Sequence, residues 1–412
     1  MREMKDSGIE WIGKIPKDWS YSKVKYHCSM KSGDNITSLN IEETSHYPVY
    51  GGNGQRGYFS QYNVDADKIL IGRQGALAGN VHYVSGKFWA TDHAIVTTPF
   101  KDINILYFFY LLKGYELNRY AQDTAAQPGL AVSKIMNLAI YLPSVCEQQQ
   151  IADYLDTKCS EIDATAEDIQ KEISLLEDYK KSVITEAVTK GLNPDAEMKD
   201  SGIEWIGDIP KDWVTIRIGN IFSLRNERNY LPMEQVQLLS LYSGKGVFPT
   251  GEEGTTNSGN HAQTVADYKI VKRNDIVVNI ILAWMGSLGI SNYDGVVSPA
   301  YDVYIPDEEK VVPHYYHYVF RTSGIANECY RYGRGIMMMR WRTYSSEFKR
   351  IHVPFPSFDE QQQIADYLDS KCSEIDTLIA DKKRQLDILA DYKKSIIYEY
   401  VTGKKEVLVK DF

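Results

Sequence analysis

Two long stretches of the chain place apolar residues at heptad spacing. In each stretch apolar positions recur every seven residues, a second set lies four residues after the first, and charged residues separate them. This period is typical of helices that pack side by side as a coiled coil. We expect the interface between the two helices to be formed by Leu155, Ile162, Ile169, Ile173, Leu176, Val183, Leu368, Ile375, Ile379, Leu386, Leu389 and Ile396.

The first of these helices has clear limits in the sequence. No Gly or Pro interrupts residues 151–190, and Gly191 followed by Pro194 is a typical helix stop. Because one helix cannot bury an apolar stripe alone, we expect the two helices to form an antiparallel pair. Apolar residues outside the seam, Ile184 and Val188, predict contact with helices of another protein. A pair that is only intramolecular remains the alternative.

The regions beside the long helices have a different pattern. Residues 20–146 and 214–359 contain short runs of β-branched and aromatic residues separated by turn residues. Helix-like patterns occur in both, over residues 105–120 and 313–330. Each region is therefore predicted to be an α+β domain with a curved or partly closed sheet.

Near-identical segments frame both domains. Residues 4–19 read MKDSGIEWIGKIPKDW, and residues 198–213 repeat them with one change. Residues 147–163 read EQQQIADYLDTKCSEID, and residues 360–376 repeat them with one change. A solenoid needs three or more short repeats, so the repeats do not predict one. Two large copies of one plan instead indicate a pseudo-twofold molecule.

The repeats divide the chain into six parts. The predicted fold class is α+β, with two α+β domains joined by two long antiparallel coiled-coil helices in pseudo-twofold symmetry. The parts are a lead segment (1–19), the first domain (20–146), the first spacer helix (147–197), the repeated lead segment (198–213), the second domain (214–359) and the second spacer helix (360–412).

Charge is unevenly distributed over these parts. The 412 residues carry a net charge of −9, yet residues 146–197 hold 13 acidic and 5 basic residues, whereas residues 20–145 and 214–357 each carry +2. The composition is ordinary for a globular protein, with no apolar run of eighteen residues and no signal-peptide pattern. Five cysteines without a C-x-x-C pair suit a reducing compartment. We therefore expect a soluble cytoplasmic protein.

The second domain concentrates its basic residues in residues 314–350. This window holds seven Arg and Lys residues against two Glu, interleaved with seven Tyr and Trp residues. Basic side chains displace counterions from nucleic-acid phosphates, and Arg can also read guanine edges. The window predicts a DNA-binding surface, with an ordinary solvated cationic face as the alternative.

Motifs for catalysis are weak. The G-x-G-x-x-G match at residues 52–57 precedes a predicted strand, whereas a dinucleotide site needs a helix there. Ser298–Tyr301 resembles a methyltransferase loop but lacks an accompanying Gly-rich cofactor turn, and His314 with His317 lacks further metal ligands. We therefore expect no catalytic residues, no cofactor site and no metal site in this chain.

The framing motifs resemble those of a known family. W-I-G-x-I-P-x-x-W at Trp11–Trp19 and Trp205–Trp213, with E-Q-Q-x-I-A-x-Y-L-D at Glu147–Asp156 and Glu360–Asp369, is similar to the specificity (S) subunit of Type I restriction–modification enzymes. The resemblance covers essentially the whole chain.

The resemblance implies a division of labour. The two domains would be target recognition domains, each reading one half of a bipartite site in double-stranded DNA. The spacer helices would dock methylation (M) subunits, two in number, and restriction (R) subunits. S-adenosylmethionine, ATP and Mg would lie in those partner subunits.

The DNA contacts are predicted from chemistry alone, because recognition domains share no fixed pattern. Arg pairs with guanine and Asn or Gln with adenine, and turns after strands can present such side chains to a groove. Any single candidate could instead touch phosphate or only solvent, since most protein–DNA hydrogen bonds go to the backbone. The candidates are Asn53, Gln55, Arg56, Arg73, Gln74, Lys87, Gln127, Arg225, Arg228, Asn257, Asn260, Arg334, Arg340 and Arg342.

Two functions of other classes remain open on the sequence. A self-sufficient methyltransferase or nuclease would need a cofactor or metal site in this chain. A coiled-coil scaffold without DNA function would account for the helices but not for two dissimilar Arg- and Tyr-bearing domains between shared boundaries. Binding of S-adenosylmethionine and of DNA would separate these alternatives.

Overall fold

The computed structural model describes residues 2–75, 77–121, 129–242, 246–251, 264–335 and 341–407. The chain divides into two compact units. The first unit comprises Met1–Gln170 and Lys383–Phe412, and the second comprises Lys171–Lys382. Each unit therefore contains one predicted domain, one lead segment and part of both long helices.

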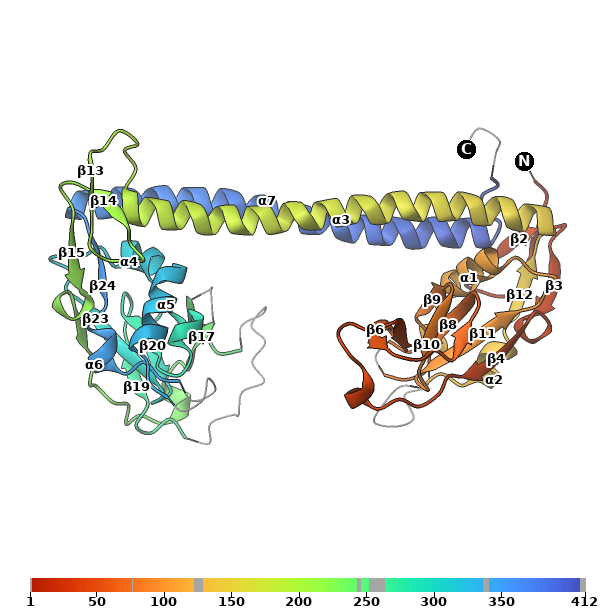
Figure 1. The fold of residues 1–412 in the computed structure, drawn as a ribbon, viewed down its shortest axis with the longest axis horizontal. Coiled ribbons are helices and arrows are strands. Elements are labelled where there is room, and N and C mark those ends of the chain that lie inside the picture. Colours follow the sequence, from red (N-terminus) through yellow and green to blue (C-terminus); the bar gives the residue numbers. More distant parts are fainter. Residues whose placement is uncertain are drawn as a thin grey trace. The chain divides into compact units, whose positions relative to one another are not determined.

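The long helices form where the heptads predict them. Helix α3 covers Val145–Lys190 and helix α7 covers Phe358–Val401 (Figure 1). Gly191 and Gly403 follow these ends closely with φ values of +75° and +67°. Glycine adopts this left-handed backbone at no steric cost, so both helices end as a C-terminal glycine signal predicts.

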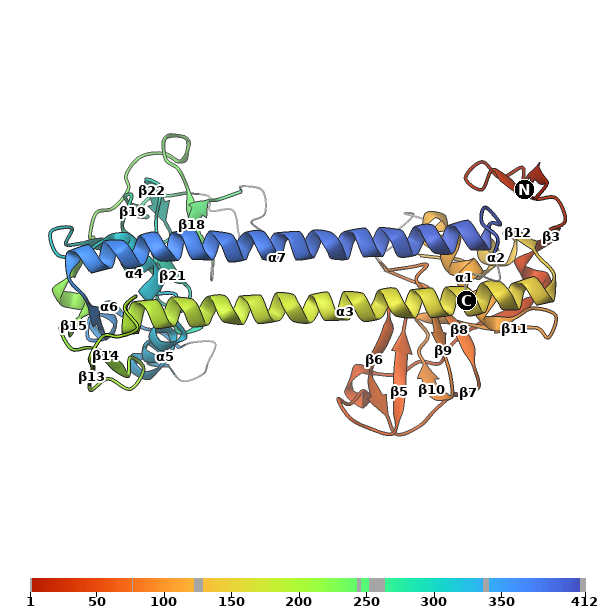
Figure 2. The same cartoon turned by 90° about the horizontal axis from the view of Figure 1, so that it is seen from above.

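In the first unit the two helices run antiparallel. The start of α3 meets the end of α7, where the rings of Tyr154 and Tyr400 have centroids 4.5 Å apart. Further along, Lys393 Nζ lies 2.6 Å from the Asp163 carboxylate. Figure 2 shows α3 and α7 side by side here.

In the second unit the same antiparallel order recurs. Lys180 pairs with Asp376 at 2.6 Å, and Lys382 pairs with Glu172 at 2.5 Å. Lysines that interrupt the heptads therefore reach carboxylates on the facing helix. Of the twelve predicted interface residues, eight are buried and four are half-buried; the half-buried ones are Leu176, Val183, Leu386 and Leu389.

The first unit is an α+β domain with two four-stranded sheets. One sheet has the order β4-β11-β8-β9 and is antiparallel throughout, and the other has the order β6-β5-β10-β7 with β5 and β10 parallel. Two smaller pairs are β1-β2 and β3-β12. The bounds are β1 Met4–Asp6, β2 Lys14–Pro16, β3 Ser20–Lys23, β4 Cys28–Ser32, β5 Tyr47–Gly51, β6 Gly54–Phe59, β7 Val64–Asp65, β8 Lys68–Gly72, β9 Val81–Val84, β10 Lys87–Ala90, β11 Ala94–Pro99, α1 Ile105–Gly114, α2 Val132–Met136 and β12 Ala139–Leu142.

The second unit repeats the plan with different strands. Its antiparallel sheet has the order β16-β23-β20-β21, and its two-stranded pairs are β13-β14, β15-β24, β17-β18 and β19-β22. The bounds are β13 Met198–Asp200, β14 Asp208–Pro210, β15 Val214–Arg217, β16 Phe222–Leu224, β17 Leu239–Tyr242, β18 Gly246–Pro249, β19 Lys269–Val271, β20 Ile276–Asn279, β21 Leu288–Ile290, β22 Gly295–Val297, β23 Tyr301–Pro306, α4 Pro313–Val319, α5 Ser323–Tyr332, α6 Ser345–Phe348 and β24 His352–Phe355. The predicted α+β class is confirmed in both units.

Both predicted domain helices are interrupted. The pattern over residues 105–120 forms α1 and then a short 3₁₀ turn, because Glu116 adopts a left-handed φ of 45°. The pattern over residues 313–330 forms α4 and α5, and the Thr322 side chain caps the second of these by accepting from Ile325 N at 3.5 Å. Helical periodicity located these segments, but local capping decided where each helix ends.

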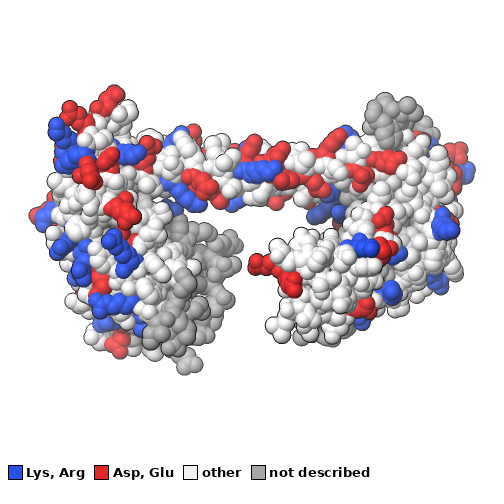
Figure 3. Space-filling view, viewed as in Figure 1, with Lys and Arg blue, Asp and Glu red and all other residues white. Residues whose placement is uncertain are grey.

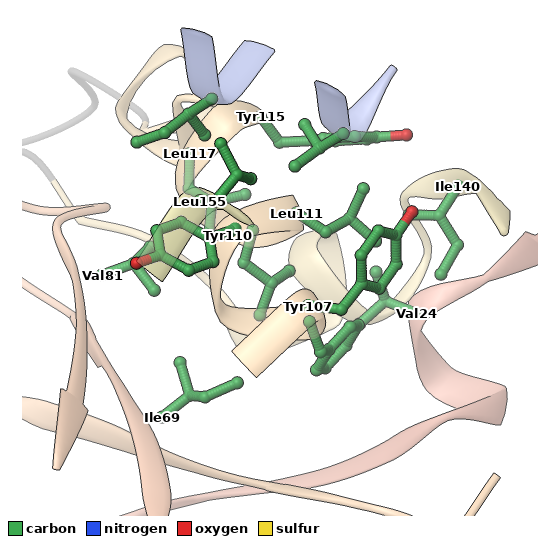
Figure 4. Close-up of a cluster of buried hydrophobic side chains, with 14 of the residues drawn as sticks. Val24, Ile69, Val81, Tyr107, Tyr110, Leu111, Tyr115, Leu117, Ile140 and Leu155 are labelled. Atoms are coloured by element: carbon green, nitrogen blue, oxygen red, sulfur yellow. The ribbon is translucent and has the colours of Figure 1, made fainter. Parts of the chain in front are cut away.

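A shared apolar core joins each domain to the long helices. In the first unit, Tyr107 and Leu111 of α1 are buried beside Leu155 of α3 and Ile140 of β12 (Figure 4). In the second unit, α4 packs with Leu368 of α7 in the corresponding cluster. The heptad residue Leu155 therefore stabilises the helix–domain junction as well as the helix pair.

The repeated E-Q-Q-Q motif holds the lead segment against the start of each long helix. Trp19 Nε1 donates to Glu147 Oε1 at 3.3 Å, and Trp213 Nε1 donates to Glu360 Oε1 at 3.1 Å. Both tryptophans are buried. The near-identity of the two repeats thus reflects one set of contacts made twice.

The next glutamine of the motif satisfies buried backbone groups. Gln148 Oε1 accepts from Asn104 N at 3.0 Å, and Gln361 Oε1 accepts from Val312 N at 2.8 Å. These amides stand directly before α1 and α4, where helix N–H groups lack intrahelical acceptors. Gln361 Nε2 also donates to Pro356 O at 3.1 Å. Each side chain therefore joins a long helix to a domain helix.

Replacing Gln361 by Met should destabilise the second unit. The Val312 N–H and the Pro356 carbonyl would lose buried partners, and each such group costs about 1–3 kcal/mol. Urea unfolding measures the loss as a lower midpoint. Gln363→Met is the matched control, because Gln363 is exposed on the same helix turn. Equal midpoints for the two variants would contradict the assigned role.

Candidate nucleic-acid interface

A hairpin turn in the first unit lies against the ends of two other strands. A Cβ built on Gly52, between β5 and β6, would stand 3.0 Å from His93 O and 3.4 Å from Gly72 Cα. Arg73 N, just after β8, donates to the same His93 carbonyl at 3.0 Å. Because a side chain would crowd this approach, glycine lets three loops converge.

Polar side chains gather where these loops meet. Asn80 Nδ2 donates to Asn53 Oδ1 at 2.8 Å, and Arg73 Nη1 donates to Ser32 Oγ at 3.0 Å. The Arg56 side chain lies over Gly51. We name this set the first-domain loop cluster; it comprises Asn53, Arg56, Arg73, Gln74, Asn80, His82 and His93.

The sequence predicted four members of the cluster, namely Asn53, Arg56, Arg73 and Gln74. It did not predict Asn80, His82 or His93. His82 lies in strand β9, and Asn80 and His93 lie in loops. Their convergence depends on strand order, and no local pattern marks them. One detail of the prediction is wrong: Gln55 and Arg56 lie within strand β6, so only Asn53 is in the turn. Strand β6 begins at Gly54, inside the glycine motif, where a dinucleotide site would need a helix.

Lys87 stands apart from the cluster. It begins β10, with its ammonium 3.7 Å from Asp65 Oδ2 and 4.8 Å from the centre of the Tyr62 ring. The other end of this strand, Ala90, leads to the loop that contains His93. Gln127 lies outside the described residues.

The prediction that Arg225 of the second domain contacts DNA is wrong. Its guanidinium is buried and donates twice to the Asp275 carboxylate, at 2.7 and 2.8 Å. This hydrogen bonding raises the pKa of Arg225 above its usual value. The side chain joins two parts of the domain core and is not available to a groove. Arg228 is exposed and donates to Asp267 O at 3.0 Å.

Arg334 and Arg342 are both exposed in the second domain. Their backbones exchange two hydrogen bonds of 2.9 Å, so the two residues are directly opposite each other in an antiparallel bridge. Their side chains therefore project from the same face of this bridge. Arg334 is 71% exposed and pairs with Glu347. The Ser346 hydroxyl and then Arg334 hold the pKa of the Glu347 carboxyl below its usual value.

Aromatic rings support part of this basic surface. Trp341 stacks on Tyr330 with centroids 5.1 Å apart, and the Arg350 guanidinium lies 5.6 Å from the centre of the Tyr332 ring. We name the surface the arginine ledge; it comprises Tyr330, Arg331, Tyr332, Arg334, Trp341, Arg342 and Arg350. Lys and Arg side chains are visible on the second domain in Figure 3.

The predicted basic–aromatic window is only partly a surface. Tyr315, Tyr316 and Tyr318 are buried in the core on α4, so they cannot stack on bases. Helix α4 uses its apolar face against the long helices, and tyrosine serves there as a large core side chain. Asn257, Asn260 and Arg340 lie outside the described residues.

The long helices leave a different face open from the one predicted. Ile184 and Val188 are buried against the second domain, where Tyr315 Oη donates to Val188 O at 3.0 Å. They are therefore unavailable to another protein. The large apolar side chains exposed on these helices instead include Leu175, Tyr179, Leu378, Ile388 and Tyr392.

Four of these exposed residues, with two tyrosines and two lysines, form two equivalent patches. The first tyrosine patch, in the first unit, comprises Tyr154, Lys158, Ile388 and Tyr392. The second tyrosine patch, in the second unit, comprises Tyr367, Lys371, Leu175 and Tyr179. Each member of one patch corresponds to a member of the other at the repeat offset.

The lysine of each patch lies near both of its tyrosines. Glu161 and, more weakly, the two tyrosines of the first patch raise the pKa of Lys158. Glu374 and the two tyrosines of the second patch raise the pKa of Lys371 in the same way. The second patch continues into a cavity of about 790 Å³ beside the end of α3, lined in part by Leu192 and Met198.

Other chemistry is sparse in the described part of the chain. No group of three or more His, Cys, Asp or Glu side chains among those residues could hold a metal ion. His314 Nε2 instead bonds to Asp369 Oδ1 at 3.1 Å, and His317 contacts Arg321 at 3.2 Å. Among the same residues, no helix is both long and apolar enough to cross a membrane.

Comparison with known proteins points to one family. A family model described as the Type I restriction modification DNA specificity domain matches residues 16–175 and 210–387. The putative type I restriction enzyme MjaX specificity subunit of Methanocaldococcus jannaschii is 27% identical, with 96% of each chain covered. The type I restriction enzyme EcoprrI specificity subunit of Escherichia coli is 46% identical over 131 residues, which is 31% of this chain and 32% of that protein.

A solved structure shares the fold. A chain described under "Structural basis underlying complex assembly and conformational transition of the type I R-M system" matches with a TM-score of 0.64 and 12% identity, covering 95% of this chain and 100% of that one. The family model spans most of both units, including each domain and the start of each long helix. This chain therefore belongs to the family of Type I restriction–modification DNA specificity proteins.

Proposed function

We propose that this chain is the DNA-specificity subunit of a Type I restriction–modification enzyme and catalyses no reaction itself. Each of its two domains reads one half of a bipartite site in double-stranded DNA. The observation that carries this proposal is the frame shared by the two units. Trp19–Glu147 and Trp213–Glu360 make one contact twice, yet each frame holds a different exposed polar surface.

The two surfaces suit different base edges. The first-domain loop cluster offers the amides of Asn53 and Gln74 with the guanidinium of Arg73, a set that can read adenine and guanine in the major groove. The arginine ledge offers guanidinium groups, which suit guanine and phosphate. Two unlike surfaces favour two unlike half-sites.

The tyrosine patches support a proposal about partners. Two patches of the same composition, one in each unit, can bind two copies of one protein through the same contacts. Tyrosine is enriched among the residues that contribute most to binding at protein interfaces. We propose that each patch docks one methylation subunit, giving two per chain, and that restriction subunits join this complex in the cytoplasm. S-adenosylmethionine, ATP and Mg then belong to the partner subunits.

Two reciprocal variants test the reading function. Asn53→Ala with Arg73→Ala should relax the bases accepted in one half-site, and Arg334→Ala with Arg342→Ala should affect only the other. One good bidentate contact contributes about 1–3 kcal/mol of discrimination, or roughly 5- to 150-fold. Methylation sequencing of cells that carry each variant with its partner subunits gives the recognised sequence directly.

The reciprocal design supplies its own control. Each variant should leave the half-site of the other domain unchanged, since no residue of that domain is altered. Relaxation of both half-sites by one variant would contradict independent reading by two domains. Binding that weakens equally on all sequences would instead assign the altered residues to phosphate contacts.

A further inference from the structure

Helices α1 and α4 are equivalent, although they lie in dissimilar parts of the sequence. The residues before them, Asn104 and Val312, donate to the equivalent glutamines of the repeated motif. Tyr110 Oη donates to Asp156 at 3.3 Å, and Tyr318 Oη donates to Asp369 at 2.5 Å. With this alignment, YFFYLLK at residues 107–113 corresponds to YYHYVFR at residues 315–321.

The last position of this alignment is a cation in both units. Lys113 ends the first segment and Arg321 ends the second. Burial raises the pKa of the Cys159 thiol on α3, and the nearby Lys393 and Lys113 oppose this rise. Burial raises the pKa of the equivalent Cys372 thiol on α7, and there Lys180 and Arg321 oppose it. The two domains otherwise differ in sequence, so a cation at the same position in both indicates that it has the same role in both.

In the first unit these cations line a cavity. It has a volume of about 570 Å³ and lies between the end of α1, the lead segment and α7. Its cationic lining consists of Lys113, Arg119, Lys393 and Lys394. Lys393 is paired with Asp163, and Arg119 is paired with Glu116, the carboxylate in the lining. Lys394 Nζ lies 3.7 Å from Asp391 Oδ1, which is outside the lining. The lining therefore has more positive than negative charge.

Lys113 is the unusual member. Its side chain is half-buried, and its ammonium makes no hydrogen bond or ion pair with any residue that the structure describes. The ammonium lies 5.2 Å from the centre of the Phe109 ring. Burial and then the nearby Lys393 lower the pKa of this amine. Placing a partly buried cation beside another one is unfavourable unless an anion enters the site.

The aromatic rings of the cavity are already engaged by cations of the chain. The Arg119 guanidinium lies 4.6 Å from the centre of the Trp11 ring, and Tyr115 meets that ring edge-on at 4.9 Å. Lys404 lies 5.9 Å from the centre of the Tyr398 ring. These contacts compete with stacking by a nucleobase. The cavity therefore favours an anionic group without a base, such as a backbone phosphate.

We propose that Lys113 and Lys394 bind a backbone phosphate of the DNA beside the half-site read by the first domain. Arg321 and Lys181 occupy the equivalent positions in the second unit and do the same there. The proposal rests on the DNA-reading function above. Backbone contacts carry no sequence information, so they suit both half-sites and recur in both units, whereas base-reading residues differ.

The test is the salt dependence of DNA binding by the full chain assembled with its methylation subunits. Each phosphate contact contributes about 0.9 to the slope of log K against log salt concentration. Lys113→Gln with Lys394→Gln should lower this slope by about one, equally on target duplex and on unrelated duplex. The methylated sequence should not change. Lys394→Gln alone, at a residue whose side chain is 70% exposed, should lower the slope by about half as much without affecting folding.

Two control variants keep the result specific. Lys17→Gln with Lys101→Gln removes the same charge from exposed positions outside the cavity and should leave the slope unchanged. Lys113→Arg should retain the wild-type slope, because the equivalent position in the second unit is an arginine.

Three results would overturn the proposal. These are an unchanged slope for both cavity variants, a change in the methylated sequence, or saturable quenching of Trp11 fluorescence by free AMP without any change in slope. The last would make the cavity a small-ligand site. If the wild-type complex itself showed no preference for any sequence, the proposed reading function would be wrong. That result differs from the three above, which concern only the phosphate site.

Discussion

Leu175→Glu with Tyr179→Glu is expected to leave the chain with one bound methylation subunit instead of two. Both side chains are exposed in the second tyrosine patch, at 68% and 50%, so the change should not disturb folding. In an interface, however, two carboxylates would lose water without gaining partners. Loss of a central aromatic contact commonly costs about 2–4 kcal/mol of binding free energy. Mass photometry of the purified complex counts the subunits.

The repeat supplies the decisive comparison. Ile388→Glu with Tyr392→Glu alters the equivalent residues of the first patch and should also leave one subunit, while all four substitutions should leave none. Gln170→Glu with Ser174→Glu adds two carboxylates at the same spacing on another face of α3, and two subunits should remain. Loss of both subunits from one patch variant would show that the patches do not act independently.

Arg225→Ala should unfold the second domain at markedly lower denaturant concentration. The Asp275 carboxylate would remain buried without its partner, and removal of one member of a buried ion pair costs about 3–5 kcal/mol. Arg225→Met with Asp275→Leu removes both charges and should recover most of this loss. Urea unfolding followed by tryptophan fluorescence measures both variants.

The exposed Arg228 provides the contrast. Arg228→Ala should change the unfolding midpoint little, because its side chain is exposed and donates to a backbone carbonyl, that of Asp267. If Arg225→Ala left stability unchanged but weakened DNA binding, the buried pair would not be structural, and Arg225 would return to the DNA contacts.

The sequence alone determined the long helices, the end of the first of them and the repeated plan. Heptads depend on local periodicity, and glycine at a helix end has a local effect, so α3 and its stop at Gly191 could be predicted directly. The two framing motifs were visible as near-identities. The α+β class followed from alternating strand and helix patterns in both domains.

The tertiary structure decided which residues of each pattern are available. Ile184 and Val188 pack against the second domain, a contact that the heptad pattern of the helices does not predict. Leu175 and Tyr179 remain exposed. Arg225 is buried because Asp275, distant in sequence, lies beside it. The convergence of Asn53, Arg73 and His93 depends on strand order. Contacts between residues far apart in the chain leave no local period, which is why these features appear only in the folded protein.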